Sequence, residues 1–213
     1  MGNKRLYDPN CTRCPRLAEF LVESQRRYPD YWCKPVPSFG DAKPKLLLVG
    51  LAPGMHGANR TGRPFTGDFA GILLYETLHA LGLATQPQSL AADDPLRLKG
   101  ARIANDVKCV PPANKPTPDE IRRCNDYLSA EIAATPSIRV LLALGRIAQE
   151  TILRTFALKP AQYMFAHGAE HALPDDRVLI DSYHCSRYNT NTGRLTAPMF
   201  RQVVKRAAAR AGV

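Results

Sequence analysis

Hydrophobic positions in this chain fall into four short apolar runs, and a helical pattern follows each of them. The runs cover residues 45–50, 101–110, 140–144 and 178–184. Continuous apolar runs are typical of strands that a parallel sheet buries on both faces. The helical patterns begin near Phe69, Pro118, Arg146 and Thr196. Strands that alternate with helices predict an α/β fold with a mostly parallel sheet.

A long polar loop, residues 50–68, follows the first apolar run and is rich in Gly, Pro, Asn and Thr. Open α/β sheets bind ligands at the carboxyl ends of their strands. Residues 105–114 follow the second run, and His184 ends the fourth run before the polar, cationic loop 185–195. Because parallel strands end at the same edge of a sheet, we expect these three segments to form one binding site.

Length and composition indicate one globular domain, residues 1–213, with an N-terminal arm over about residues 1–40. The chain has 213 residues, of which 45% are hydrophobic and 23% are charged. It has no apolar run of 18 residues, so no membrane span is expected. Its first eight residues lack the apolar core of a signal peptide, which favours a cytoplasmic protein. The formal net charge of +10 favours a polyanionic partner.

Four of the six cysteines form two pairs that indicate a thiolate-bound centre. Cys11 and Cys14 have two residues between them, and Cys109 and Cys124 have fourteen. Disulfides are rare in cytosolic proteins, so a metal centre is the better interpretation. Both zinc and a [4Fe–4S] cluster accept four thiolates, and the spacing does not distinguish them.

Four longer motifs cover residues 50–68 (GLAPGMHGANRTGRPFTGD), 109–118 (CVPPANKPTP), 145–148 (GRIA) and 182–196 (SYHCSRYNTNTGRLT). Together they resemble the motifs of the family 5 (type b) uracil-DNA glycosylases. The resemblance implies a three-layer αβα sandwich around a four-stranded parallel sheet. It also implies a [4Fe–4S] cluster on Cys11, Cys14, Cys109 and Cys124. Members of this family excise uracil, often with other deaminated bases such as hypoxanthine, and thereby start base-excision repair.

This resemblance implies a monomeric hydrolase whose partner is double-stranded DNA carrying a deaminated base, with single-stranded DNA as an open alternative. A base inside a duplex must be flipped out before its glycosidic bond can be attacked. Phe65 is predicted to stack on the flipped base, and His184 to stabilise negative charge on the uracil as a hydrogen-bond donor. The other residues expected to contact the base are Gly50, Leu51, Ala52, Pro53, Gly54, His56 and Asn105.

The residue that orients the attacking water is harder to predict. Other uracil-DNA glycosylases have Asp, Asn or Glu just after the first strand, where this chain has Leu51 and Ala52. The matching family 5 position for a carboxylate is Asp68, and Asn114 matches another position near the base and the water. Asp68 is also a natural N-cap for the helix that begins at Phe69. Both roles are possible only if its carboxylate faces the pocket.

Contacts with the DNA backbone are expected from Asn59, Arg60, Arg63, Arg187, Tyr188 and Arg194. Arginines suit phosphates, amides supply hydrogen bonds, and an aromatic ring can enter the duplex where the base has left. The two arginines of the loop 50–68 could instead brace that loop. Two other functions stay open: a family 4-like enzyme restricted to uracil, and an inactive iron–sulfur protein that binds damaged DNA.

Overall fold

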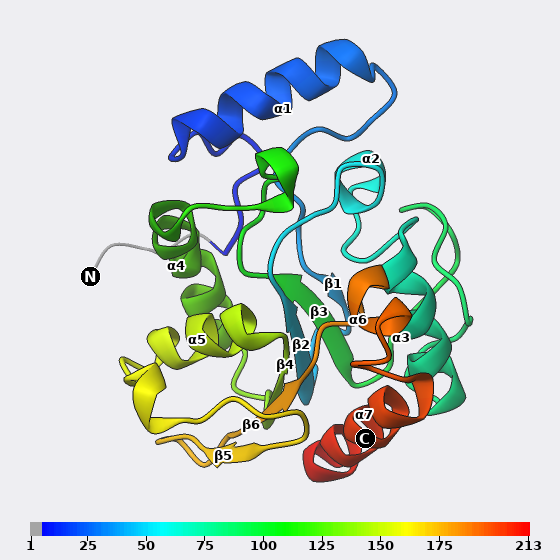
Figure 1. The fold of residues 1–213 in the computed structure, drawn as a ribbon, viewed down its shortest axis with the longest axis vertical. Helices are drawn as coiled ribbons and strands as arrows, with labels where there is room; N and C mark the ends of the chain where they lie inside the picture. Colours follow the sequence, from blue (N-terminus) through cyan, green and yellow to red (C-terminus); the bar gives the residue numbers. More distant parts are fainter. Residues whose placement is uncertain (1–5) are drawn as a thin grey trace.

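A six-stranded sheet runs through the middle of the computed structural model, which describes residues 6–213 (Figure 1). The strands are β1 (Phe39–Gly40), β2 (Leu46–Gly50), β3 (Ala101–Asn105), β4 (Val140–Leu144), β5 (Glu170–Ala172) and β6 (Val178–Ser182). The helices are α1 (Pro15–Arg27), α2 (Ala58–Thr61), α3 (Phe69–Ala80), α4 (Pro118–Ala134), α5 (Arg146–Thr155), α6 (Arg187–Asn191) and α7 (Ala197–Ala211), with 3₁₀ turns η1 (Pro112–Asn114) and η2 (Pro160–Gln162).

The strand order is β1-β3-β2-β4-β6-β5, and the four inner strands are parallel. These four are the strands that the apolar runs predict, so the expected α/β fold is confirmed. The two edge strands, β1 and β5, pair antiparallel with their neighbours and were not predicted. They have only two and three residues, which is too short for a recognisable alternation of polar and apolar positions.

Helices cover both faces of the sheet and give it three layers (Figure 1). Alternate side chains of β2 point to opposite faces, as the pleat of a strand requires. Leu46 and Leu48 pack in the core with α3 and α7, whereas Leu47 and Val49 pack in the core with α4 and α5. All four side chains are fully buried, which explains why β2 is apolar at every position.

The parallel inner strands place three loops at one edge of the sheet. Gly50, the last residue of β2, is the register partner of Asn105, the last residue of β3. β3 ends five residues earlier than expected, because the chain turns there across the end of β2. The N–H groups of Asp106 and Val107 donate to the carbonyls of Gly50 and Leu51. This turn holds Asn105 beside the loop that begins at Leu51.

The N-terminal arm packs on α4, outside the three layers (Figure 1). The Arg16 guanidinium binds Glu120 through bonds of 2.6 and 2.8 Å, and Arg13 bonds Asp126 at 3.0 Å. Glu120 also completes a capping box with Thr117 at the start of α4. The first five residues of the expected arm lie outside the part of the chain that the structure describes. Within residues 6–213, every helix is too short or too polar to cross a membrane.

Candidate active site

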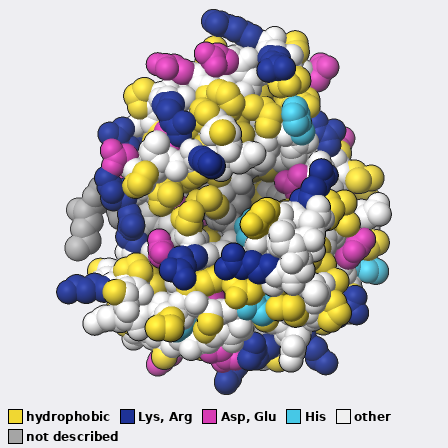
Figure 2. Space-filling model, in the orientation of Figure 1, with side chains coloured by type: hydrophobic (Ala, Val, Ile, Leu, Met, Phe, Trp, Pro, Cys, Tyr) yellow, Lys and Arg dark blue, Asp and Glu magenta, His cyan; other side chains and the backbone are white. Residues whose placement is uncertain are grey.

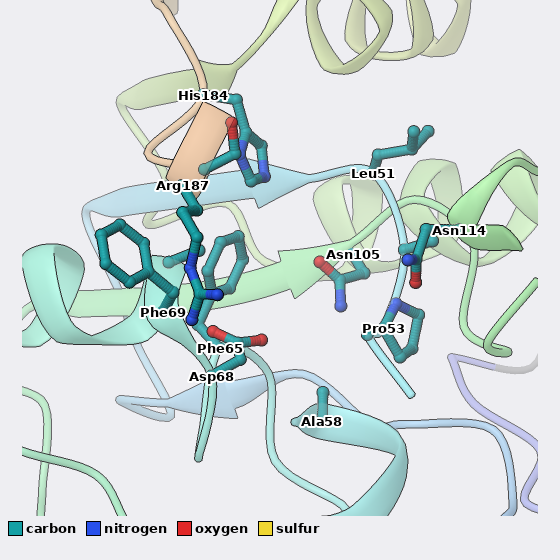
Figure 3. Close-up of a pocket in the computed structure, with 14 residues that line it drawn as sticks. Leu51, Pro53, Ala58, Phe65, Asp68, Phe69, Asn105, Asn114, His184 and Arg187 are labelled. Atoms are coloured by element: carbon teal, nitrogen blue, oxygen red, sulfur yellow. The ribbon is translucent and has the colours of Figure 1, made fainter. Parts of the chain in front are cut away.

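A cavity of about 430 Å³ opens at the carboxyl edge of the sheet. Figure 2 shows a hollow on this face, with Lys and Arg side chains on several sides of it. The loop after β2, the end of β3, the turn η1 and the segment after β6 all contribute to its wall. Figure 3 shows its side chains, which come from Leu51, Ala52, Pro53, Gly54, Ala58, Phe65, Asp68, Phe69, Ala70, Asn105, Asn114, His184, Ser186 and Arg187. The three segments expected to meet therefore do meet.

Phe65 lies in this cavity with a backbone conformation that bulky residues rarely adopt, at φ 54°. Gly71 and Gly50 leave the space that Phe65 needs in this position. A Cβ on Gly71 would lie 1.8 Å from the Phe65 carbonyl oxygen, and a Cβ on Gly50 would lie 2.7 Å from the Phe65 ring. The Tyr75 hydroxyl donates a 2.9 Å hydrogen bond to the carbonyl of Pro64, the residue before Phe65. Gly50, which we expected to contact the base, instead lies beneath Phe65 and leaves room for its ring.

Asn105 brings an amide into the cavity from the end of β3. Its side chain is 2% exposed, and its Oδ1 atom has no hydrogen-bond partner among the described residues. Figure 3 shows the amide pointing into the cavity. Buried polar groups without a partner are rare in folded proteins. A ligand with its own hydrogen-bonding edge would satisfy this one.

Asp68 is both a helix cap and part of the cavity wall. Its Oδ1 accepts a 2.8 Å hydrogen bond from the Gly71 N–H at the start of α3. Its Oδ2 faces the loop after β2, where a Cβ on Gly57 would lie 2.5 Å from it. Burial raises the pKa of Asp68, against hydrogen bonds from the Gly71 and Ala70 N–H groups that lower it. The structure thus meets the condition under which capping and a role in the pocket can coexist.

His184 lies against Phe65, with ring centroids 5.8 Å apart and planes at 28°. Burial lowers the pKa of His184 to about 4. The imidazole is therefore neutral at pH 7, and one ring nitrogen carries a proton that it can donate. Its backbone carbonyl accepts a 2.8 Å bond from the Asn189 amide of α6. A neutral donor of this kind fits the role that the sequence predicts.

Asn114 reaches the cavity from an exposed turn. Ala113 and Asn114 both have left-handed backbone conformations, with φ 54° and 56°. The Asn114 N–H donates to the Pro111 carbonyl at 3.0 Å, which holds the turn. Figure 3 shows the Asn114 side chain beside Pro53 at the mouth of the cavity.

Four of the residues predicted to bind DNA, namely Arg60, Arg187, Tyr188 and Arg194, are exposed. Arg187 lines the cavity, with its guanidinium 5.0 Å from the centre of the Phe69 ring. Tyr188 is 72% exposed on α6. Arg194 lies over the Tyr183 ring at 4.6 Å, and Arg60 lies outside the base cavity beside His56. His56 itself was expected to contact the base but lines a neighbouring groove.

The prediction that Asn59 and Arg63 bind DNA is wrong, because both side chains are buried. The Asn59 amide donates to the sulfur atoms of Cys33 and Met55, each at 3.5 Å. Arg63 is 4% exposed and pairs with Asp94 at 2.5 Å. Bracing of the loop 50–68, which we also considered, is the role that these contacts give Arg63.

Four wall residues were not predicted: Ala58, Phe69, Ala70 and Ser186. Phe69 follows Asp68 directly, so its place beside the cap could have indicated it. Ala58 has no chemical signature, and only the course of the loop into α2 brings it to the cavity. No sequence signal pairs Arg63 with Asp94, which lies in the distant segment 83–96.

The four paired cysteines line one small pocket between α1 and α4. The Lys108 N–H donates to the Cys124 sulfur at 3.2 Å. Burial raises the pKa of Cys124 to about 12. Burial raises the pKa of Cys109 further, and the nearby thiols of Cys124, Cys11 and Cys14 add to that effect. Within residues 6–213, no group of three or more His, Cys, Asp or Glu side chains is placed to hold a metal ion.

The fold is α/β, and its cavity brings together an aromatic face, an amide, a carboxylate and a neutral imidazole, an arrangement that can hold a flat ring. The chain belongs to the uracil DNA glycosylase superfamily, whose family model matches residues 37–208.

Several curated proteins resemble the chain over most of its length. A type-5 uracil-DNA glycosylase of Thermus thermophilus is 50% identical over 208 residues, which are 95% of this chain and 94% of the relative. A type-5 uracil-DNA glycosylase of Pyrobaculum aerophilum is 42% identical over 95% of this chain and 90% of its own. A type-4 uracil-DNA glycosylase of Archaeoglobus fulgidus is 37% identical, but over only 58% of this chain and 55% of its own.

Proposed function

We propose that this protein is a monofunctional uracil-DNA glycosylase of type 5, which hydrolyses the bond between uracil and deoxyribose. The observation that carries the proposal is the convergence of Phe65, Asn105, Asp68 and His184 on one cavity. These residues come from three separate strand ends, and each supplies a function that the reaction needs. The likeness to two type-5 enzymes over 95% of the chain supports the same assignment.

Binding begins when the damaged nucleotide leaves the duplex and its base enters the cavity. The ring of Phe65 supplies a flat apolar surface on which the base stacks. The Asn105 amide presents one donor and one acceptor to the edge of the base, because Oδ1 has no partner among the described residues. Uracil offers a complementary N–H and carbonyl pair.

Cleavage of the glycosidic bond leaves positive charge on the sugar and negative charge on the uracil. His184 donates a hydrogen bond to the uracil carbonyl as this negative charge develops. A neutral imidazole is suited to that role because it keeps its proton after the base has left. The low pKa of His184 thus favours donation without proton transfer.

Asp68 orients the water and stabilises the cationic sugar. Its capping bond from Gly71 holds Oδ1, which leaves Oδ2 directed toward the loop after β2. An ionised carboxylate there accepts a proton from the attacking water and attracts the sugar cation. Asn114, at the mouth of the same cavity, is the second polar side chain that can hold this water.

The substrate range extends to other deaminated bases and to DNA in duplex form. Hypoxanthine is also a flat base, so it can stack on Phe65 in the same cavity without depending on the Asn105 amide. The basic side chains around the cavity and the charge of +10 match a phosphate backbone. The protein acts as a monomer on cytoplasmic DNA.

The test uses labelled oligonucleotides with one uracil, hypoxanthine or thymine mispair, followed by alkali cleavage of abasic sites. We expect cleavage at uracil and none at thymine. A protein that binds these strands without producing abasic sites would be a binding protein instead. Excision of uracil but not hypoxanthine would favour the uracil-restricted activity of type 4.

A [4Fe–4S] cluster on Cys11, Cys14, Cys109 and Cys124 joins the N-terminal arm to α4. The four thiols line one pocket, yet they are not gathered around a point for a single ion. Tetrahedral zinc needs all four sulfur atoms about 2.3 Å from one centre. A [4Fe–4S] cluster would take one thiolate on each of its four iron atoms, so it would not need the four sulfur atoms to meet at one centre. When bound, it supplies a rigid link between segments that the arm's surface ion pairs hold only weakly.

Absorption spectroscopy of protein purified without oxygen tests this cofactor. We expect a broad band near about 400 nm and four iron atoms per chain. Cys124→Ala should lose both, whereas Cys33→Ala, which removes a buried thiol outside this pocket, should keep them. Stoichiometric zinc without the band would contradict the cluster.

A further inference from the structure

A second, larger groove opens beside the base cavity and extends beyond the residues that the proposed reaction uses. Its volume is about 680 Å³. Its walls come from the loop after β2, the first turns of α3 and the segment around Leu90. The groove and the base cavity share five residues: Gly54, Asp68, Phe69, Asn114 and Arg187. A strand whose damaged base occupies the cavity therefore has the groove directly next to it.

Arg187 stands where the two hollows meet. Its guanidinium lies 5.0 Å from the centre of the Phe69 ring, and Phe69 also lines both hollows. Figure 3 shows the side chain extending from α6 toward Asp68, alongside Phe69. Two neighbouring nucleosides are joined by one phosphate, so a cation between two base sites is the charge that such a linkage requires.

The groove offers an apolar surface to whatever enters it. Ile72 is 52% exposed and Leu90 is 66% exposed, and both line it. Exposed large aliphatic side chains that share one concave surface indicate a binding site more strongly than scattered ones do. A flat nucleobase can cover these two side chains while its sugar and phosphate stay at the rim.

Another part of the groove wall, formed by His56 and Arg60, is cationic and has aromatic rings next to it. The His56 ring nitrogen Nδ1 lies 3.0 Å from the Tyr31 hydroxyl, and the His56 carbonyl accepts a 2.9 Å bond from Arg60. Tyr31 stacks on Tyr28 with centroids 4.6 Å apart. Cations interleaved with aromatic rings are typical of surfaces that follow a single nucleic-acid strand. The groove thus shares Arg187 with the base cavity, whereas Arg60 and His56 line the groove alone.

We infer that this groove binds the nucleotide next to the flipped one, on the same DNA strand, with its base against Ile72 and Leu90. Arg187 holds the phosphate between the two nucleotides, and Arg60 holds the next phosphate. The inference rests on the proposed function, because it takes the neighbouring cavity as the site of the damaged base. It gives His56 and Arg60 a role in holding the strand outside the base cavity.

The test removes the neighbouring base instead of the damaged one. Labelled strands carry one uracil with a tetrahydrofuran abasic analogue on its 5′ side, on its 3′ side or on neither. Single-turnover excision and binding by fluorescence anisotropy are measured for the wild type, Ile72→Ala and Leu90→Ala. Val22→Ala is the matched control, because Val22 is as exposed as Ile72, at 52%, but lies on α1 and outside the groove.

For the wild type and the control, we expect one of the two abasic neighbours to lower kcat/KM roughly tenfold, because it leaves the apolar surface of Ile72 and Leu90 uncovered. Ile72→Ala should lower kcat/KM on the intact strand and reduce the penalty of the abasic neighbour to about twofold or less. Equal rates on all three strands would overturn the inference. A tenfold loss of kcat/KM with the abasic neighbour that is unchanged in Ile72→Ala and Leu90→Ala would also overturn it. If uracil is not excised from any strand, the proposed function fails, and the same comparison of affinities still decides whether the groove holds a neighbour.

Discussion

The replacement of Asp68 by Asn is the sharpest test of the active site, because this residue has two separable roles. Asn keeps an oxygen in the place of Oδ1, but it replaces Oδ2 by an NH2 group and removes the negative charge. Its amide can therefore still accept the 2.8 Å bond from the Gly71 N–H. Asn is about as good an N-cap as Asp, so we expect the free energy of unfolding to change by less than about 1 kcal/mol.

The effect on catalysis should be much larger. A side chain that takes a proton from the nucleophile accelerates a reaction by about 10²–10⁴-fold. Asp68→Asn should therefore lower the single-turnover rate by at least about 100-fold, which corresponds to about 2.7 kcal/mol in the barrier. Asp68→Ala should lower the single-turnover rate by a similar factor. It should also lower the free energy of unfolding by about 1 kcal/mol, because it removes the helix cap as well.

The pH dependence of the excision rate tests the role of Asp68 independently. Burial raises the pKa of Asp68 above the ordinary value of about 3.9. Because the carboxylate must be ionised to accept a proton, the wild-type rate should fall as the pH decreases through this raised pKa. Asp68→Asn should lose that acidic limb.

The assay follows excision of uracil from a labelled duplex with enzyme in excess, over a pH series that extends from neutral into the acid range. Thermal unfolding of the same samples checks the fold. An Asp68→Asn enzyme within threefold of the wild type, with its acidic limb intact, would refute a role for Asp68 in orienting the water. Asn114→Ala would then be the next variant to measure.

Four further variants test other parts of the molecule. Asn105→Ala should cut excision of uracil while sparing excision of hypoxanthine, and equal losses on both substrates would contradict a role in reading the base. His184→Ala should lower the rate by about 10²–10³-fold. Because the pKa of His184 is about 4, the pH profile of the wild-type rate should show no step near pH 6.5 that depends on this residue. A step near pH 6.5 that His184→Ala abolishes would argue for a charged imidazole. Arg63→Ala should cost about 3 kcal/mol of stability by leaving Asp94 unpaired, whereas Arg187→Ala should leave the melting temperature unchanged and reduce the salt dependence of DNA binding by about one phosphate contact.

The four inner strands and the helices that follow them could be predicted because each depends on a local pattern. Leu46–Gly50 and Val140–Leu144 are buried at every position, and full burial leaves an uninterrupted apolar run that a reader of the sequence can recognise. The position of the site followed from the same pattern, since parallel strands bring their carboxyl ends together. Phe65, Asp68 and His184 were therefore expected at the edge where the structure has them.

Edge strands and buried charges could not be predicted in this way. β1 and β5 are too short to have a period, and they exist only because a neighbouring strand offers free backbone groups. The loop 50–68 has the composition of an exposed loop, yet Asn59 and Arg63 are buried in it. An arginine has the same chemistry whether it meets a phosphate or Asp94, so the sequence alone does not distinguish these partners.

The sequence by itself thus determined the αβα architecture, the edge that carries the site and the types of side chain available there. The tertiary structure decided what each of those side chains faces. Asp68 both caps α3 and faces the cavity, because Gly54 and Gly57 leave space beside its free oxygen. The groove that begins at Arg187 exists only where α3, α6 and the segment around Leu90 meet. Local patterns record whether a residue is buried, but the partners of a residue depend on segments far away in the chain.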